Sequence, residues 1–109
     1  MEENNYGRIV TVASRAALEP SAQTAAYSAS KAGVLAFTRS VAEEMKGTGI
    51  TANTVLPSVI DTAANRKTMG EKQADKWVKP ESLAEVICFL ASEKAADLRG
   101  AAIPVYGNV

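Results

Sequence analysis

The sequence predicts an α/β fold in three layers, a short parallel sheet of about three strands flanked by helices. Two β-branched apolar runs, at residues 9–13 and 50–56, lie on either side of a long helix-forming segment. A strand, a helix and a strand in this order need a right-handed crossover, which makes the two strands parallel. A second helix-forming segment and a third apolar run, at residues 101–106, follow. We therefore expect the order β-α-β-loop-α-β in a single domain over residues 1–109.

The first strand is predicted at residues 9–13, where the sequence reads IVTVA. Short, β-branched and continuously apolar runs are typical of strands that are buried on both faces. Ser14 and Arg15 end the strand, and the small polar residues around Pro20 indicate a loop. In open α/β sheets, ligands bind at this carboxyl end of the strands.

The longest helix is predicted from about residue 21 or 25 to Lys46, with Gly47 as the residue that ends it. Its larger apolar residues recur at helical spacing and predict a stripe packed on the sheet: Val34, Phe37, Val41 and Met45. Its small residues also recur, and they favour close packing against a second helix: Ala26, Ala29, Ser30, Gly33, Ala36 and Ser40.

The remaining elements follow from apolar spacing and from proline. Residues 50–56 form the second strand candidate, which Pro57 stops. The polar residues 58–79 predict a mobile loop with a short helix, which could serve as a lid. Pro80 opens a helix with an acidic first turn, and Cys88 within it is expected to be a small buried hydrophobe. Pro104 places the last strand at an edge of the sheet.

Composition excludes several classes of protein. Twelve basic residues balance twelve acidic ones among 109 residues, and neither sign forms a long block, so no nucleic-acid partner is expected. No apolar stretch is long enough to span a membrane, and no apolar segment follows the polar start, so the expected compartment is the cytoplasm. Histidine is absent, which removes the commonest general base and metal ligand.

Tyr27 and Lys31 share one face of the long helix, because residues four apart are neighbours on a helix surface. A tyrosine hydroxyl has an unperturbed pKa of about 10, and a nearby positive charge favours its ionised form. The pair is therefore a candidate proton donor and acceptor. The alternative interpretation is an amphipathic surface tyrosine beside a solvated lysine.

Four segments together resemble the short-chain dehydrogenase/reductase family. GRIVTVAS at residues 7–14 is similar to the family's fifth strand with its catalytic serine, and YSASKAG at residues 27–33 to its active-site helix. NTVLPSVIDT at residues 53–62 resembles the segment after its sixth strand, and residues 80–107 resemble its last helix and seventh strand. The resemblance covers only the carboxyl-terminal half of the family's Rossmann-like fold.

The resemblance implies an oxidoreductase that acts on a carbonyl or alcohol with NAD or NADP. Tyr27 would be the general acid/base, Lys31 would lower its pKa and bind the nicotinamide ribose, and Ser14 would orient the substrate oxygen. Backbone groups from Pro57 to Ile60 would approach the nicotinamide carboxamide. The residues implied in cofactor binding are Tyr27, Lys31, Pro57, Ser58, Ile60 and Thr62, the last at the carboxamide or pyrophosphate.

The sequence also departs from the family. It carries no Gly-rich turn between a strand and a helix, the feature that holds the pyrophosphate of a dinucleotide. Gly47 and Gly49 occur in the reverse order, after a helix and before a strand. Ser58 stands where the family usually has glycine, and a Cβ there restricts the close backbone approach of a cofactor.

Half of a doubly wound sheet leaves a strand edge without a partner. The strand at residues 9–13 would expose unpaired N–H and C=O groups, and the small-residue face of the long helix would lack its neighbour. We expect a homo-oligomer, most simply a homodimer, formed through that strand or that helix, or a separate chain that supplies the missing half.

Three functions follow from these features. The first is an oxidoreductase that needs a complementary half, and the second is a non-catalytic, self-associating domain. The third is a different small-molecule site built across a dimer interface from Ser14, Tyr27 and Lys31.

Overall fold

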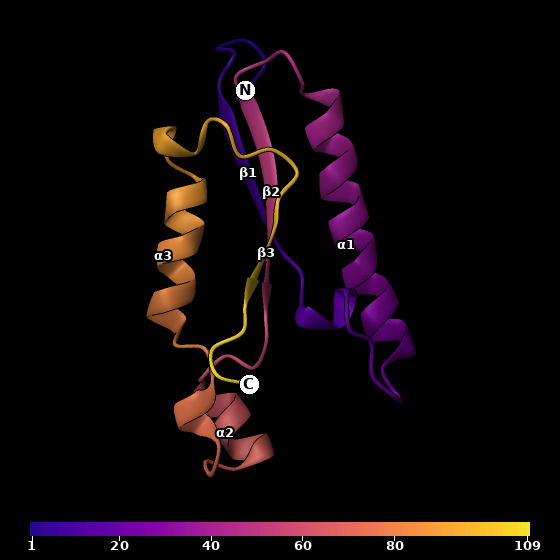
Figure 1. Ribbon diagram of the computed structural model, residues 1–109, viewed down its shortest axis with the longest axis vertical. Coiled ribbons are helices and arrows are strands. Elements are labelled where there is room, and N and C mark those ends of the chain that lie inside the picture. The colour runs from indigo at the N-terminus through magenta and orange to yellow at the C-terminus, as the bar shows by residue number, and fades with distance from the viewer.

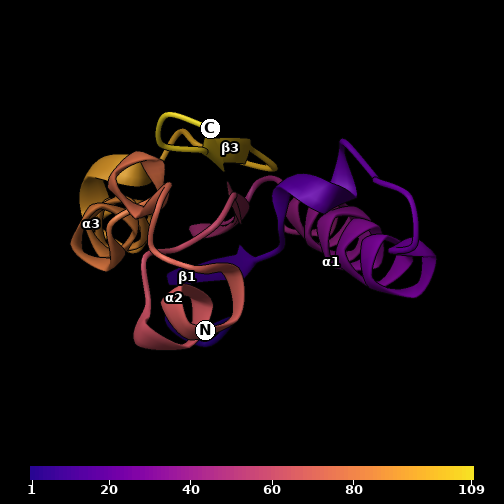
Figure 2. The same ribbon diagram turned by 90° about the horizontal axis from the view of Figure 1, so that it is seen from below.

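The computed structural model describes residues 1–109 as a three-layer α/β structure (Figure 1). The sheet has the order β1-β2-β3, and both strand pairs are parallel. Seen along the strands, α1 lies on one face of the sheet and α3 on the other (Figure 2). The predicted fold class is therefore confirmed. The elements are β1 Gly7–Val12, α1 Ala25–Glu44, β2 Ile50–Pro57, α2 Ala63–Met69, α3 Pro80–Leu90 and β3 Ala102–Val105.

The central strand β2 is buried along its whole length, whereas β1 is not. β1 pairs with β2 on one side only, and Val12 at its end keeps 43% of its surface exposed. The prediction that this strand is buried on both faces is therefore wrong. An apolar sequence shows only that a strand can be buried. Because β1 has no neighbouring strand on its outer side, part of its surface stays exposed.

α1 buries a different face from the predicted one. Its buried residues are Ser28, Leu35, Thr38 and Ala42, whereas Phe37 is 64% exposed. Val34, Val41 and Met45 are only partly buried. The predicted stripe is therefore not the buried face of α1. Leu35 is buried together with small and polar side chains, and the Thr38 hydroxyl forms a hydrogen bond with the Thr11 hydroxyl of β1. α1 ends at Glu44, two residues before the predicted Lys46, and Gly47 lies in the turn that follows, with a φ of +82°.

Residues 58–79 contain the predicted short helix, α2, and more fixed structure than a loop. Ile60 and Val78 form a parallel β-bridge, and both Trp77 and Val78 are buried. Arg66 binds Asp61 through two hydrogen bonds of 2.6 and 2.9 Å. Mobility of the segment stays a prediction.

The main apolar core lies between the sheet and α3. Val55 of β2 packs there with Val78, Leu83 and Leu90. Cys88 is exposed, so its assignment to the core is wrong. On a helix that buries Leu83 and Leu90, position 88 falls on the opposite side, because each residue turns the helix by about 100°. β3 is an edge strand, as Pro104 predicted.

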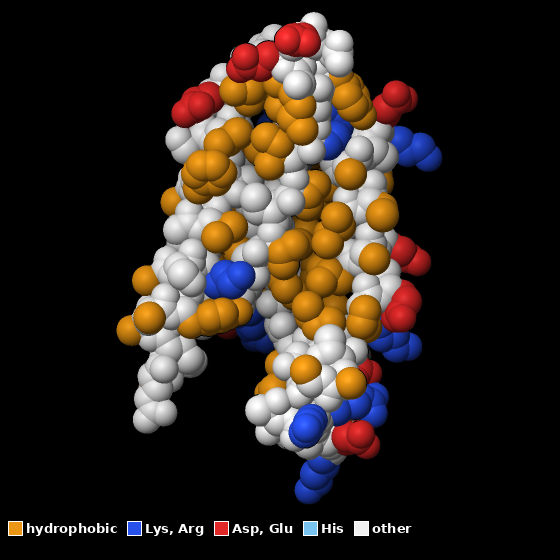
Figure 3. All heavy atoms as spheres, turned by 180° about the vertical axis from the view of Figure 1, so that it is seen from behind, with side chains coloured by type: hydrophobic (Ala, Val, Ile, Leu, Met, Phe, Trp, Pro, Cys, Tyr) orange, Lys and Arg blue, Asp and Glu red, His pale blue; other side chains and the backbone are white.

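From the side of β1, apolar side chains form a band down the middle of the molecule (Figure 3). The exposed or partly buried apolar residues of β1 are Ile9, Val10 and Val12. No helix of the structure combines the length and the apolar composition that are needed to cross a membrane.

Candidate functional site

A cavity of about 450 Å³ opens at the carboxyl ends of β1 and β2. Its volume lies within the range of about 300–1,000 Å³ that is usual for small-molecule sites. Ser14, Tyr27 and Ser58 all line it, so the structure brings together three of the residues that the sequence predicts. Lys31, Pro57, Ile60 and Thr62 lie outside this lining. The position matches the carboxyl-end location at which open α/β sheets bind ligands.

Ser14 follows β1 and begins a short 3₁₀ turn, Arg15–Ala17. Its Oγ accepts a hydrogen bond of 3.2 Å from the backbone N–H of Ala16. A serine hydroxyl has one proton and two acceptor lone pairs. The capping bond uses a lone pair, so the Ser14 proton stays available to an oxygen in the cavity.

Tyr27 and Lys31 lie in the first turns of α1, one turn apart. The Lys31 ammonium is 5.8 Å from the centroid of the Tyr27 ring, so the predicted pair is adjacent in space. The Tyr27 side chain is half exposed and lines the cavity, whereas Lys31 lies beside it and is partly buried. The geometry therefore presents a phenol to the cavity with a cation next to its ring.

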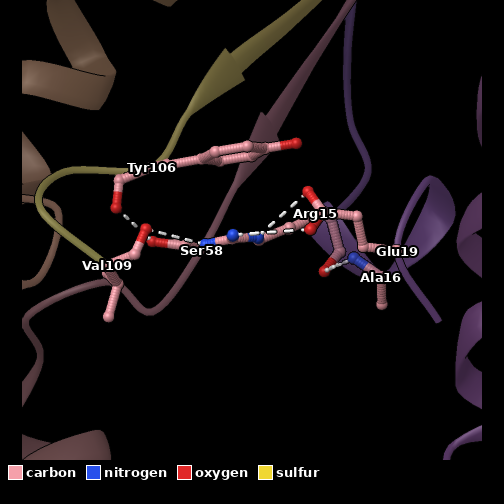
Figure 4. A network of polar contacts seen from close by, with 7 residues as sticks. Arg15, Ala16, Glu19, Ser58, Tyr106 and Val109 are labelled. Carbon is pink, nitrogen blue, oxygen red and sulfur yellow. Dashed lines mark hydrogen bonds and ion pairs between the residues drawn. The ribbon is translucent and has the colours of Figure 1, made fainter. Parts of the chain in front are cut away.

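Ser58 follows β2 and contacts the end of β3. Its N–H donates to the Val105 carbonyl at 3.1 Å. Its Oγ donates to the Tyr106 carbonyl at 2.7 Å (Figure 4). Its φ lies outside the left-handed region, so the backbone here does not require glycine. The Ser58 hydroxyl is thereby held by Tyr106, the residue that follows β3.

The segment after Ser58 has free backbone donors. Neither the Val59 N–H nor the Ile60 N–H donates a hydrogen bond within the chain. The Ile60 carbonyl accepts from the Asn65 side chain at 2.8 Å, and Thr62 Oγ1 accepts from the Asn65 N–H at 3.1 Å. Thr62 is thus the N-cap of α2, and it keeps its hydroxyl proton.

The hydrogen bond from Arg66 holds the pKa of Asp61 below its ordinary value, and the Arg66 and Lys79 charges lower it further. The same pair raises the pKa of Arg66. Both groups therefore stay charged at neutral pH and fix the start of α2, which carries Asn65 and Met69 of the cavity wall.

Arg15 is a cavity residue that sequence reasoning missed. Its guanidinium carbon lies 4.4 Å from the centroid of the Tyr106 ring. Nη1 donates to the backbone oxygen of Val109 at 2.9 Å, and Nε donates to a Glu19 carboxylate oxygen at 3.2 Å (Figure 4). The i, i+4 spacing of Arg15 and Glu19 was visible in the sequence. The contacts of Arg15 with Tyr106 and Val109, which lie 91 and 94 residues further along the chain, were not.

The hydrogen-bond donors that line the cavity or follow its lining in the chain fit the nicotinamide end of a dinucleotide. The free Val59 and Ile60 N–H groups match the carbonyl oxygen of a carboxamide, and the Thr62 hydroxyl proton adds a donor. A phosphate cradle of the Gly-rich type is absent from the sequence. No group of three or more His, Cys, Asp or Glu side chains is placed to hold a metal ion.

The fold and the site place the protein in the Rossmann-like α/β class. The family model described as enoyl-(acyl carrier protein) reductase matches residues 1–107. The chain belongs to this family and so to the short-chain dehydrogenases/reductases, as its motifs indicated.

Relatives and solved structures agree with this assignment. The chain is 38% identical over 117 aligned residues to the 3-oxoacyl-[acyl-carrier-protein] reductase MabA of Mycobacterium tuberculosis, and the alignment covers 100% of this chain and 47% of that protein. It is 37% identical over 105 residues to a 2-dehydro-3-deoxy-L-rhamnonate dehydrogenase (NAD(+)) of a Sphingomonas species, covering 88% and 42% of the two. The actinorhodin polyketide ketoreductase F189W with NADPH superposes with a TM-score of 0.86 at 31% identity.

That superposition covers 98% of this chain and 48% of the ketoreductase. A 3-oxoacyl (acyl-carrier-protein) reductase from Agrobacterium tumefaciens with NADP gives a TM-score of 0.85 at 28% identity, over 98% and 46%. The chain thus spans about half the length of the proteins that it matches.

Proposed function

We propose that the protein is the carboxyl-terminal part of an NAD- or NADP-dependent oxidoreductase that acts on a carbonyl or alcohol. It would be active only when an amino-terminal half completes the fold. The observation that carries this proposal is the meeting of Ser14, Tyr27 and Ser58 in one ligand-sized cavity beside Lys31. The nicotinamide cofactor, when bound, supplies or accepts the hydride.

Each residue has a role that its geometry supports. Tyr27 presents its hydroxyl to the cavity and exchanges a proton with the substrate oxygen. The Lys31 ammonium lies beside the Tyr27 ring, 5.8 Å from its centroid, and would bind a ribose hydroxyl of the cofactor. The free Ser14 proton holds the substrate oxygen in place. The Val59 and Ile60 N–H groups receive the carboxamide.

The names of the relatives favour a ketone or an alcohol as the reacting group. Several relatives are named as reductases of 3-oxoacyl groups on acyl carrier protein, and one as a dehydrogenase of a sugar acid. All of these names describe the exchange of a carbonyl and a hydroxyl. We extend this reaction class to the chain through its family.

A complementary half is needed for two reasons. Dinucleotide binding requires phosphate contacts that the sequence lacks. The outer edge of β1 also has no strand partner, and it is flanked by exposed apolar side chains (Figure 3). An added strand and helix would pair that edge and cover those side chains.

The test is a titration with NADH and NADPH of the 109-residue chain, first alone and then co-expressed with the amino-terminal half of the M. tuberculosis MabA reductase. We expect no measurable binding by the chain alone. The co-expressed pair should bind cofactor with a micromolar dissociation constant and reduce a 3-oxoacyl thioester. A stable complex that neither binds cofactor nor turns over substrate would refute the enzymatic proposal.

The second candidate is a non-catalytic domain that associates with itself. It is favoured by the exposure of the small-residue face of α1, whose members are all solvent-exposed: Ala26, Ala29, Ser30, Gly33, Ala36 and Ser40. Phe37 on the same face is 64% exposed. Self-association without cofactor binding in either form of the titration would support this candidate. The surfaces proposed for it are this face of α1 and the edge of β1.

A further inference from the structure

The cavity lining carries one charged side chain of each sign. Of the 11 residues that line it, Arg15 and Glu19 are the charged ones. Arg15 comes directly after Ser14, the residue proposed to hold the substrate oxygen. A substrate held by Ser14 and Tyr27 therefore lies within reach of a guanidinium group in the same cavity.

The Arg15 guanidinium is fixed in orientation but not saturated. Its face lies over the Tyr106 ring, which restricts the plane of the group. A guanidinium carries five N–H donors. Three are engaged, Nε and Nη2 with Glu19 and Nη1 with Val109. One N–H on each Nη nitrogen remains for a ligand.

The contact with Glu19 can be exchanged for a ligand. Its two N–O distances are 3.2 and 3.4 Å, longer than the 2.7–2.9 Å of strong charge-assisted bonds. The Glu19 side chain is 55% exposed. Exposed pairs of this kind contribute little because water and ions compete for both partners. Glu19 thus neutralises Arg15 without holding it firmly.

The position already accommodates an acceptor oxygen. The backbone oxygen of Val109 lies 2.9 Å from Nη1, and Val109 is itself part of the cavity lining. Planar guanidinium groups are matched to carboxylate oxygens, which can take two parallel N–H bonds. The same donors therefore fit the carboxylate of a small ligand.

We propose that Arg15 selects substrates that carry a carboxylate, so that the cavity takes a small oxo acid or hydroxy acid. This inference rests on the proposed function, because it takes the cavity as the substrate site. The carboxylate replaces Glu19 on the guanidinium, while the carbonyl or hydroxyl of the substrate lies toward Ser14 and Tyr27. Arg15 is then a specificity-determining residue.

The experiment measures binding rather than turnover. The 109-residue chain, without cofactor, is titrated with acetoacetate and with its neutral counterpart methyl acetoacetate. Binding is followed by NMR of the Arg15 Nε–H and the Ala16 backbone N–H. We expect saturable shifts with acetoacetate and an affinity at least about tenfold higher than for the ester. Equal affinities, or no shift with the acid, would overturn the proposal.

Three variants separate recognition from structural support. Arg15→Gln should abolish the preference for the acid. Glu19→Gln should strengthen acetoacetate binding several-fold, because it removes the competing carboxylate. A purely structural role for Arg15 predicts no gain in Glu19→Gln, so an unchanged or lower affinity there contradicts the proposal even if Arg15→Gln fails to fold. Arg39→Gln, on the exposed face of α1, is the matched control and should behave as the wild type.

The outcome is independent of the cofactor titration. Acid-selective binding by the chain, together with a stable co-expressed complex that neither binds cofactor nor turns over substrate, would sustain the role of Arg15 and refute the oxidoreductase. Turnover of neutral carbonyl compounds, with no preference for the acid, would support the oxidoreductase and refute the role of Arg15.

Discussion

Three threonine hydroxyl groups form a directed chain in the layer between α1 and the sheet. Thr38 donates its proton to the Val34 carbonyl at 2.8 Å. Thr38 therefore accepts a hydrogen bond from the Thr11 hydroxyl at 2.7 Å. Thr11 in turn accepts a hydrogen bond from the Thr54 hydroxyl at 2.8 Å. Thr38 and Thr54 are almost fully buried. The polar face of α1 is thus satisfied within the core.

Replacing Thr11 should show how much the hydrogen bonds among the three threonines contribute to stability. Thr11→Val keeps nearly the same shape but leaves the buried Thr54 hydroxyl without an acceptor. We expect the free energy of unfolding to fall by about 1–3 kcal/mol. Chemical denaturation measures the change. The double variant Thr11→Val with Thr54→Val should recover part of the loss, and Thr68→Val on the exposed side of α2 should change little. Losses that simply add in the double variant would contradict the hydrogen-bond chain.

Tyr27→Phe tests the proton-transfer role. In the co-expressed complex we expect cofactor affinity to stay nearly unchanged and turnover to fall by about 10²–10⁴-fold, the range attributed to general acid–base catalysis. Steady-state kinetics with NADPH provides the measurement. Tyr6→Phe, which removes an exposed phenol at the other end of β1, is the control. Turnover that persists in Tyr27→Phe would remove Tyr27 from the mechanism.

At the scale of elements, the segment between β2 and α3 is fixed at its base. The Ile60–Val78 bridge joins its two ends, and the Asp61–Arg66 pair and the Thr62 cap fix the start of α2. Its polar composition predicted a mobile loop with a short helix, and α2 is that helix. Hydrogen bonds between residues 59–61 and Val78, which apolar periodicity did not indicate, join the ends of the segment.

The Asp61–Arg66 pair makes a prediction about pH. Folding lowers the pKa of Asp61, so its stabilising contribution is complete above the unfolded value of about 3.9 and is lost as the pH falls through the lower folded value. Asp61→Asn should therefore lower the midpoint of thermal unfolding at pH 7, and the difference from wild type should shrink toward pH 3. Asp75→Asn, an exposed carboxylate without an ion pair, is the control. A difference that is the same at both pH values would exclude the carboxylate as its cause.

For the whole molecule, the decisive feature is the open edge of β1. The N–H groups of Gly7 and Ala13 donate to Gly49 and Val55 on the β2 side. Because successive backbone groups of a strand alternate in direction, those of Arg8, Val10 and Val12 point to the free side. Unpaired edges of this kind invite another strand.

Val12→Pro removes one donor from that edge and leaves the β1–β2 bonds intact. If a second copy pairs with β1, we expect the wild-type mass to rise with concentration in light scattering and the dissociation constant to increase at least about tenfold in Val12→Pro. Val12→Thr keeps the N–H and is the control. A dimer that survives Val12→Pro but is lost in Gly33→Leu would assign the interface to α1 instead. A wild-type protein that is monomeric at every concentration would refute self-association through either surface, the edge of β1 or the face of α1.

The order of elements, the parallel sheet and the family could be predicted from the sequence. These depend on local spacing: the β-branched runs, the long helix between them, and the distances from Ser14 to Tyr27 and Lys31. The end of the long helix was local to within two residues, since α1 ends at Glu44 and Gly47 has a positive φ in the turn that follows.

Which side chains are buried, and which come into contact, depends on the packing of the elements. Cys88 points outward and Phe37 is exposed because burial depends on where neighbouring elements lie, and helical spacing alone leaves that open. Arg15 reaches Tyr106 and Val109 because β1 and β3 both end at the same side of the sheet. That meeting of distant segments forms the cavity wall, and no local pattern encodes it.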